Sequence, residues 1–372
     1  MIKLYRIIIA IVCLYSVFTG SAFSQTVSTK NIPNLMSSEE VSRLLTTPAC
    51  MKSFNRSDTT YSIEYINIPS NGISLYGRLF LPKSSGKYPL IVFIHGGHNN
   101  LELLNSAPLY YAPRLAHCGY AALVYDKRGT GKSGGVFHES TYDDFITDIG
   151  NAAVYLSKHK AINPERIGVY GGSQGGRFAP LAAARFDIIS FAISASGPIG
   201  TIEENWNYNI KNALKIRGNP DSTIDAVMPY WLRHHAAWAN NDTLEFNALA
   251  KEIIKLREKY DPFIIPSTYE EIITDSNLFM FRAGFNSISR DYLSELKNFR
   301  KKWLCIYGEL DEQVNAQASI KNLTACMEAS KNENYSIILF RGHEHSFRNV
   351  KTGDQEPIIN IIVNWFNENV GS

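Results

Sequence analysis

A serine flanked by glycines lies where an apolar run of the sequence passes into a helix-like stretch. Residues 171–176 read Gly-Gly-Ser-Gln-Gly-Gly and follow the run Ile167–Tyr170, with Ser173 at their centre. A nucleophile on a sharp strand-to-helix turn requires glycines two positions before and after it, because the strand and the helix pass close together there. The start of the helix would also favour negative charge that develops during a reaction. An ordinary glycine-rich turn is the alternative, but the residues described next favour Ser173 as a nucleophile.

A serine hydroxyl becomes a useful nucleophile only when a positioned base takes its proton. The chain has nine histidines, and two of them, His343 and His345, follow the strand-like run Tyr335–Phe340. The frame Gly342-x-x-His345-x-Phe347 places His345 about one turn beyond the end of that strand. We therefore predict His345 as the base and keep His343 as the alternative.

A carboxylate must then hold the histidine in the right tautomer and stabilise its charged form. The segment that follows the apolar run Trp303–Tyr307 offers Asp311 for this role, with Glu309 and Glu312 as nearby alternatives. The acid and the base would each follow one of two successive strands, so they would meet at the same edge of a parallel sheet. The sequence thus contains all three residue types of a nucleophilic triad.

Acyl transfer also requires backbone N–H groups that face the oxygen on which negative charge develops. The tripeptide His95-Gly96-Gly97 follows the apolar run Leu90–Ile94, whose strand we expect beside that of the nucleophile. The predicted donors of this oxyanion hole are the N–H groups of Gly97 and of Gln174, the residue directly after the nucleophile. We expect His95 to be a structural residue of its turn rather than a proton carrier.

The elements that would position these residues are strand-like runs alternating with amphipathic helices. Two runs around Asn71-Gly72 predict an antiparallel hairpin. Beyond the hairpin, continuous apolar runs alternate with helical stretches, which indicates a mostly parallel sheet covered by helices on both faces. The fold class is therefore α/β. The strand-like runs are 61–68, 73–81, 90–94, 121–125, 167–170, 188–193, 303–307 and 335–340.

The alternation stops between residues 201 and 290, which contain helical repeats and many aromatic residues but no strand-like run. We predict a helical cap inserted into the sheet domain, with apolar side chains on its lower side that would contribute to a substrate pocket. The predicted division of the chain is a signal peptide at 1–24, an N-terminal arm at 25–60, a catalytic domain at 61–200 and 291–372, and the cap at 201–290.

Together these motifs resemble the α/β-hydrolase superfamily over nearly all of Tyr61–Trp365. Three segments are similar to its bacterial esterase and acyl-peptidase-like branch, namely His95-Gly96-Gly97, the stretch Tyr125–Ser133 and the glycine-rich hexapeptide around the serine. The chain order serine, aspartate, histidine is also that of this superfamily. The resemblance implies an α/β-hydrolase fold, the triad just described, and carboxylesterase activity on short or aromatic acyl esters. Two histidines in the final loop, where one is usual, depart from the family pattern.

Two other functions are weighed beside ester hydrolysis. The same machinery could act on peptides, in which case an acidic pair must grip a free N-terminus, and Glu203 and Glu204 are the candidates. A catalytically silent hydrolase fold could also serve as a binding protein. The predicted mechanism uses no metal and no organic cofactor, and the pair His234-His235 has no third ligand at a suitable spacing. The G-x-G-x-x-G match at Gly129–Gly134 does not open a helix directly, so no dinucleotide site is expected.

The first residues have the parts of a secretory signal peptide. Lys3 and Arg6 form a basic start, residues 7–18 are almost wholly apolar, and Ala22 and Ser24 are small residues before the expected cleavage point. The apolar run is shorter than the roughly twenty residues that span a bilayer. We therefore expect an exported protein, periplasmic or secreted, that is free of the membrane once the signal peptide is removed.

Composition limits the partners of such a protein. Hydrophobic residues make up 45% of the chain and charged residues 19%, and its 37 basic and 35 acidic side chains nearly cancel. This balance argues against nucleic acid or an anionic membrane as a partner and leaves a small-molecule ester as the expected one. Export permits disulfides among Cys50, Cys118, Cys305 and Cys326 without deciding a pairing. Cys305 is predicted to be buried in a strand.

Overall fold

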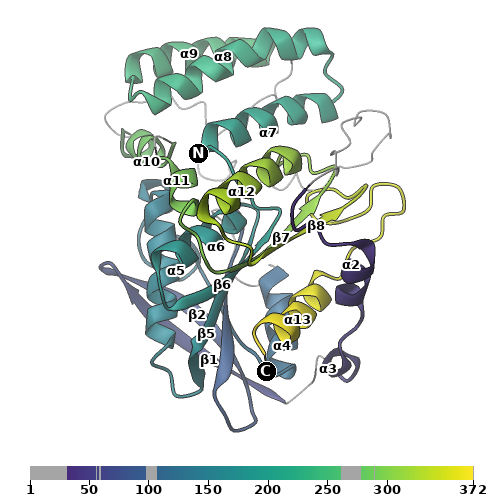
Figure 1. Ribbon diagram of the computed structural model, residues 1–372. Coiled ribbons are helices and arrows are strands. Elements are labelled where there is room, and N and C mark those ends of the chain that lie inside the picture. Colours follow the sequence, from purple (N-terminus) through teal and green to yellow (C-terminus); the bar gives the residue numbers. More distant parts are fainter. Residues whose placement is uncertain are drawn as a thin grey trace.

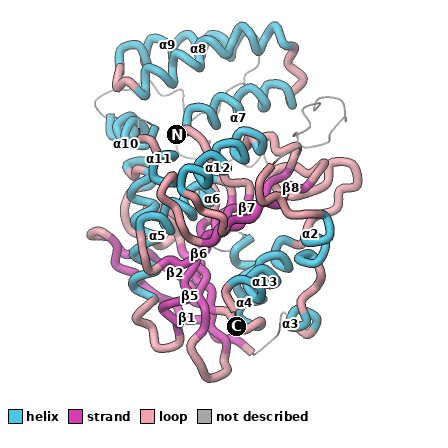
Figure 2. Tube along the Cα trace, in the orientation of Figure 1, coloured by secondary structure: helices cyan, strands magenta, loops and turns pink. Residues whose placement is uncertain are grey.

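The centre of the molecule is one eight-stranded sheet, seen in Figures 1 and 2. The computed structural model describes residues 32–55, 57, 60–97, 107–260, 278–288 and 290–371. The strand order is β1-β2-β4-β3-β5-β6-β7-β8, with β1 and β2 antiparallel and β3 to β8 parallel to one another. The strands are β1 (Tyr61–Ser70), β2 (Ile73–Pro82), β3 (Tyr88–Ile94), β4 (Ala121–Tyr125), β5 (Ile162–Gly172), β6 (Ile189–Ala195), β7 (Lys302–Gly308) and β8 (Tyr335–Phe340).

The predicted hairpin is confirmed by the pairing of β1 with β2. Ser70 lies opposite Ile73, which leaves Asn71 and Gly72 as a two-residue loop. Both loop residues have positive φ, 43° for Asn71 and 81° for Gly72. This is the turn whose twist matches that of the two strands, and Asn-Gly is its preferred sequence.

The sheet is buried on both faces, which explains why its inner strands read as unbroken apolar runs. In β3, Leu90, Val92 and Ile94 belong to one core cluster, while Ile91 and Phe93 belong to another on the opposite face. Helices α5 (Tyr142–Leu156), α6 (Gln174–Arg185) and α12 (Ala316–Ser330) contribute to the first cluster, and α2 (Ser38–Leu45), α4 (Ala107–His117) and α13 (Ile358–Asn369) contribute to the second.

The described part of the segment between β6 and β7 contains helices joined by turns and no strand, as predicted for the insertion. In Figure 1, α8 and α9 lie above α7 and farthest from the sheet. Residues 261–277 and residue 289 of the predicted cap lie outside the described residues. The α/β-hydrolase fold class, with its N-terminal hairpin and helical insertion, is therefore confirmed. The helices of this segment are α7 (Ile202–Ile216), α8 (Asp221–Ala239), α9 (Thr243–Lys259), α10 (Leu278–Ile288) and α11 (Tyr292–Leu296).

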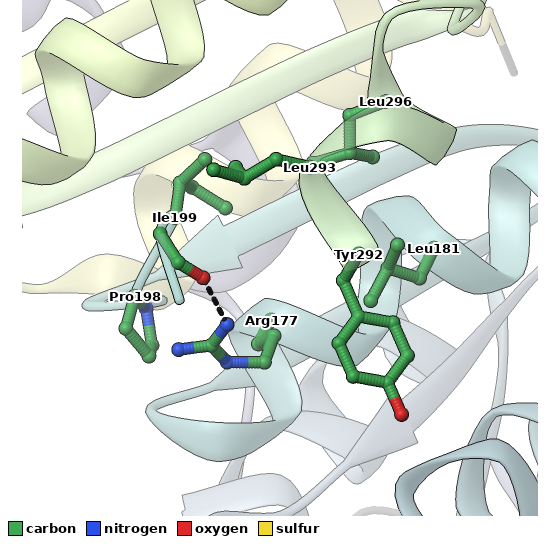
Figure 3. Close-up of a pocket in the computed structure, with 8 residues that line it drawn as sticks. Arg177, Leu181, Pro198, Ile199, Tyr292, Leu293 and Leu296 are labelled. Atoms are coloured by element: carbon green, nitrogen blue, oxygen red, sulfur yellow. Dashed lines mark hydrogen bonds between the residues drawn. The ribbon is translucent and has the colours of Figure 1, made fainter. Parts of the chain in front are cut away.

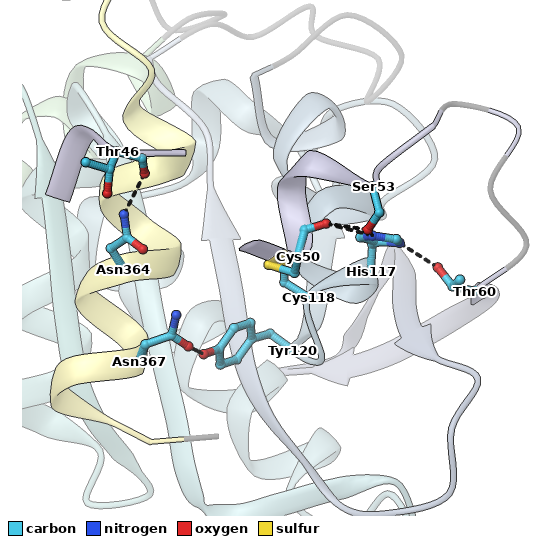
Figure 4. Close-up of a disulfide and its surroundings, with 9 residues drawn as sticks. All are labelled: Thr46, Cys50, Ser53, Thr60, His117, Cys118, Tyr120, Asn364 and Asn367. Atoms are coloured by element: carbon cyan, nitrogen blue, oxygen red, sulfur yellow. Dashed lines mark hydrogen bonds between the residues drawn. A yellow bond between two sulfur atoms is a disulfide. The ribbon is translucent and has the colours of Figure 1, made fainter. Parts of the chain in front are cut away.

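A disulfide fastens the N-terminal arm to the sheet domain. Cys50, in the short helix α3 (Ala49–Lys52), is bonded to Cys118 just after α4 (Figure 4). The neighbouring His117 contacts the carbonyl of Cys50 at 2.9 Å and the hydroxyl of Thr60 at 2.9 Å, so side chains reinforce the covalent link. Cys305 is a buried free thiol in β7, as expected.

The predicted signal peptide at 1–24 lies outside the described residues. Within the described ranges, no helix combines the length and the apolar character needed to cross a bilayer.

Candidate active site

Ser173 lies on the sharp turn between β5 and α6, in a backbone conformation that ordinary residues avoid. Its φ is 54° and its ψ is −121°. The flanking glycines make this turn possible. A Cβ atom on Gly171 would lie 1.9 Å from the carbonyl oxygen of Gly175, and one on Gly175 would lie 2.5 Å from the carbonyl oxygen of Ile94. The turn thus has the geometry of a nucleophile elbow, in which a half-buried serine is presented at the end of the strand.

Asp311 and His345 form a hydrogen-bonded pair beyond the ends of β7 and β8. The Nδ1 atom of His345 lies 2.9 Å and 2.8 Å from the two carboxylate oxygens of Asp311. The carboxylate also accepts hydrogen bonds from the N–H groups of Gln313 and Val314, both at 2.8 Å, and is 1% exposed. Burial lowers the pKa of His345, but the charge and hydrogen bond of Asp311 outweigh this effect and hold the pKa above its ordinary value.

His343, the alternative base, has a different environment. Its Nδ1 atom lies 2.7 Å from the carbonyl oxygen of Arg341, and its Nε2 atom lies 3.0 Å from the carboxylate of Glu356. The ring also packs against Phe340 and is 7% exposed. Both nitrogens of His343 are therefore occupied by structural contacts, and the acid of the predicted triad is bound to His345 instead.

The end of β6 connects the serine turn to the histidine loop. The N–H of Ser173 donates to the carbonyl oxygen of Ala195 at 2.8 Å, and the hydroxyl of Ser196 donates to the carbonyl oxygen of His345 at 2.9 Å. Ser173 and His345 are thus bound to consecutive residues. Among the described residues, no hydrogen bond joins the Ser173 hydroxyl to either histidine of the loop. Such contacts often tighten only when a substrate is bound.

The turn after β3 lies against the serine turn. A Cβ atom on Gly96 would lie 3.5 Å from the Cβ of Ser173, and one on Gly97 would lie 3.8 Å from the Cβ of Gln174. The carbonyl oxygen of Gly96 accepts a hydrogen bond from the buried ammonium group of Lys127 at 2.7 Å and lies 3.1 Å from the Nδ1 atom of His95. The two predicted oxyanion donors therefore come from neighbouring turns.

The alternative acids have other partners. Glu309 binds the guanidinium of Arg341 at 3.0 Å and the N–H of Gly342 at 3.1 Å. Glu312 accepts a weak hydrogen bond of 3.4 Å from the N–H of His345, and burial and the charge of Asp311 raise its pKa. Neither carboxylate is bonded to an imidazole ring nitrogen of the final loop.

A small hollow lies between α6 and α11, close to the start of the helical insertion. Its wall includes Arg177, Ile199 and Tyr292, and none of the three predicted triad residues lines it (Figure 3). The buried guanidinium of Arg177 donates to the carbonyl oxygens of Gly200 and Thr201, at 2.5 Å and 3.4 Å. This arginine thus fixes the segment through which the chain leaves the sheet for the insertion, and the hollow is separate from the predicted chemistry.

Sequence reasoning missed three contributors to this site. Lys127, Ser196 and Tyr208 are bound to the carbonyl oxygens of Gly96, His345 and Asp311, respectively. Only Lys127 carried a usable signal, because a lysine two residues after a wholly apolar strand lies close to a buried region. The described part of the chain contains no cluster of three side chains suited to hold a metal ion.

A family model described as X-Pro dipeptidyl-peptidase (S15 family) matches residues 71–339. Human dipeptidyl peptidase 8 is 31% identical over 140 residues, which cover 34% of this chain but only 16% of that protein. The matched segment is thus a small part of that relative.

Two solved structures share the fold. Est1E from Butyrivibrio proteoclasticus, with ferulic acid bound, has a TM-score of 0.50 and 21% identity, with 82% of this chain and 100% of Est1E covered. Acetyl xylan esterase 1 from a Thermoanaerobacterium species has a TM-score of 0.51 and 14% identity, with 91% and 95% covered. The family match, the elbow at Ser173 and the strand order agree: the chain belongs to the X-Pro dipeptidyl-peptidase (S15) family of the α/β-hydrolase superfamily.

Proposed function

We propose that this protein hydrolyses carboxylic esters with short or aromatic acyl groups through an acyl-enzyme on Ser173. The observation that carries the proposal is the hydrogen-bonded pair of Asp311 and His345, which is joined through the end of β6 to the strained serine turn. An aspartate bound to Nδ1 leaves Nε2 of the same ring as the proton acceptor. In this proposal, residues from neighbouring strand ends supply the base and the orienting acid that an activated serine requires.

The reaction follows in two steps. The Ser173 oxygen attacks the ester carbonyl while His345 takes the hydroxyl proton, and the tetrahedral intermediate collapses as the alcohol leaves with that proton. Water then attacks the acyl-enzyme while His345 takes a proton from it, and His345 returns this proton to the Ser173 oxygen as the acid is released. The N–H groups of Gly97 and Gln174 stabilise the negative oxygen in both intermediates. The helical insertion would exclude water and screen substrates by size.

The surroundings of Glu204 favour esters over peptides. Its carboxylate accepts a hydrogen bond from the N–H of Thr201, and its own N–H donates to the Thr201 hydroxyl, both at 3.1 Å. This capping box uses the carboxylate at the start of α7, where the side chain is exposed. Of the two acidic residues considered for gripping a peptide N-terminus, only Glu203 is outside this arrangement.

The direct test is labelling of the purified protein with a fluorophosphonate probe, beside Ser173→Ala, His345→Ala and His343→Ala. We expect labelling of the wild type and of folded His343→Ala, and loss of labelling in the other two variants. Loss of labelling in His343→Ala but not in His345→Ala would assign the base to His343. An unlabelled wild type would favour the binding-protein hypothesis.

Substrate class is tested on the unlabelled wild-type enzyme. Steady-state rates should be compared for acetyl, butyryl and feruloyl esters and for aminoacyl and X-Pro amides. The ferulic acid bound in Est1E is a reason to include the feruloyl ester. A kcat/KM for amides above that for every ester would overturn the ester proposal and leave the triad assignment intact.

We further propose that the protein is exported. The disulfide between Cys50 and Cys118 supports this, because such bonds persist mainly in oxidising compartments. Cell fractionation and N-terminal sequencing of the natural protein test it, with a mature N-terminus at Gln25 as the expected result. An intact N-terminus in the cytosol would contradict export.

A further inference from the structure

Lys127 is a lysine with almost no contact with solvent. It follows β4, is 1% exposed, and belongs to the largest fully buried side chains described in the molecule. Burying an ammonium group is costly unless hydrogen bonds compensate, so a lysine at such a place needs an explanation. Within the described part of the chain, no carboxylate lies within ion-pair distance of it.

The ammonium group of Lys127 binds two oxygens, one in the peptide group that carries the proposed Gly97 donor and one in the side chain of Gln174, the other proposed donor residue. It donates to the carbonyl oxygen of Gly96 at 2.7 Å and to the side-chain oxygen of Gln174 at 3.0 Å. The rings of Phe145 and Phe178 lie on its other sides, at 5.7 Å and 5.5 Å from Nζ to the ring centres. Burial lowers the pKa of Lys127 to about 7.

The contact with Gly96 acts on the neighbouring donor through the peptide plane. The carbonyl of Gly96 and the N–H of Gly97 belong to one planar trans peptide group and point in opposite directions. Fixing the oxygen at one end therefore fixes the direction of the N–H at the other. A charged donor on the carbonyl also polarises the peptide group and strengthens the hydrogen bond that its N–H can give.

The contact with Gln174 acts on the second donor. Gln174 is the first residue of α6 and directly follows Ser173. The Lys127 ammonium group holds the side chain of Gln174 against the turn of Gly96 and Gly97. This contact joins the two halves of the oxyanion hole. We propose that Lys127 is a positioning residue of the oxyanion hole, which orients the N–H groups of Gly97 and Gln174 toward the developing negative charge. This inference rests on the proposed function of Ser173.

The test compares two lysine variants in the full chain. Lys127→Met keeps the length of the side chain and removes its donors. The matched control is Lys301→Met, because the ammonium group of Lys301 also binds two carbonyl oxygens, those of Ala183 at 2.7 Å and Phe186 at 2.9 Å, but near the C-terminal end of α6. Active sites are counted by fluorophosphonate titration, so that kcat refers to folded, competent molecules only.

We expect kcat per active site to fall about 10- to 100-fold in Lys127→Met, somewhat less than the loss of a whole oxyanion donor. The KM should change less than about threefold. The rate constant of fluorophosphonate labelling should fall together with kcat, because labelling and ester hydrolysis both place negative charge on the oxygen bound in the oxyanion hole. Lys301→Met should keep the wild-type kcat. An unchanged kcat per active site in Lys127→Met would overturn the proposal and assign the lysine a purely structural role.

A second variant covers the case in which Lys127→Met does not fold. Gln174→Leu removes the side-chain oxygen that Lys127 binds and retains the backbone N–H. Its kcat per active site should fall about 3- to 10-fold, as for loss of part of a positioning network. A wild-type kcat in Gln174→Leu would then overturn the inference. A wild type that neither labels nor hydrolyses any ester would instead overturn the proposed function, so the two failures are distinguishable.

Discussion

The sheet domain and the helical insertion bury their ionisable groups in different ways. In the sheet domain such groups have specific polar partners, as in the bidentate contact of Arg128 with Asp148 at 3.0 Å and 2.8 Å. In the insertion, the adjacent His234 and His235 of α8 are completely buried among aromatic rings. Burial lowers their pKa values to about 4 and about 3, so both are neutral at pH 7.

The polar groups of the two regions therefore have different roles. Around the proposed site, charges are held by directed hydrogen bonds, because catalysis depends on the direction of each donor and acceptor. In the insertion, the ring of His234 packs against Phe246 with 3.9 Å between ring centres, and His235 has an uncharged partner, the side-chain oxygen of Asn207 at 2.8 Å from Nδ1. The sheet domain should therefore be sensitive to loss of single partners, and the insertion to acid.

The largest effect is expected from the charged pair of the sheet domain. Asp311→Asn should lower kcat by about 10⁴-fold, because the amide can hold His345 in the wrong tautomer. The wild-type kcat/KM should fall with decreasing pH through a value above 6.5, since the base must be neutral and its pKa is raised. In the variant this acid limb should move to lower pH, because the carboxylate charge that favoured the imidazolium is gone. Rates measured from pH 5 to 9 check both expectations.

Glu309→Gln is the matched control for this experiment. Glu309 follows the same strand but binds Arg341 and the N–H of Gly342 instead of the imidazole. Its kcat and pH profile should stay within about threefold of the wild type, as for a partly exposed ion pair. A larger loss in Glu309→Gln than in Asp311→Asn would contradict the assignment of the acid.

The second-largest effect is a loss of stability at low pH, which we expect to arise in the insertion. A histidine whose pKa is lower in the folded than in the unfolded state stabilises the fold fully above the unfolded pKa of about 6.5, and this stability is lost as the pH falls toward the folded pKa. Lowering the pH from 7 to 5 should cost about 2 kcal/mol for each of His234 and His235. Tryptophan fluorescence reports it, because Trp206, Trp231 and Trp238 lie in the insertion.

His234→Phe tests the origin of that transition. The phenyl ring can stack on Phe246 and cannot be protonated, so about half of the acid destabilisation should disappear. An acid transition unchanged by His234→Phe, and seen first in sheet-domain probes, would break the proposed contrast between the two regions.

The third effect concerns the covalent link that only the sheet domain and its arm possess. The insertion contains no cysteine, whereas Cys50 and Cys118 close a loop with a sequence separation of 68. Replacing both by serine should reduce the free energy of unfolding by about 3 kcal/mol. Thermal melting with and without reductant checks this, since the double variant should no longer respond to reductant. If reductant still lowered the melting temperature of the double variant, the disulfide between Cys50 and Cys118 would not be the source of the response.

Much of the sheet domain could be predicted because its sequence signals are local. Burial on both faces requires unbroken apolar runs such as Leu90–Ile94, and the passage of a helix across a strand end requires glycines around Ser173. These constraints act within about ten residues. They were sufficient for the fold class and for the candidate nucleophile, acid and base.

The contacts that escaped prediction depend on register and on long-range packing. The partner of Cys50 and the environment that separates His343 from His345 follow from which loops meet after the sheet has formed. Lys127 is a similar case, because its oxygens at Gly96 and Gln174 lie 31 and 47 residues away in the sequence. In the insertion, periodicity predicted helices, but the depth at which His234 is buried depends on how α8 packs against α9.

The smallest effect tests how far the two regions are coupled. Tyr208 in α7 donates its hydroxyl hydrogen to the carbonyl oxygen of Asp311 at 2.8 Å, and the side-chain amide of Asn212 donates to the carbonyl oxygen of Glu312 at 3.3 Å. Two hydrogen bonds thus join the insertion to the acid loop. Tyr208→Phe should cost about 1 kcal/mol of stability, the usual value of one such bond, and lower kcat less than about fivefold. Tyr155→Phe, on an exposed part of α5, is the matched control and should change neither quantity. If Tyr208→Phe lowered kcat as much as Asp311→Asn, the insertion would be part of the catalytic arrangement, and the contrast between the two regions would have to be abandoned.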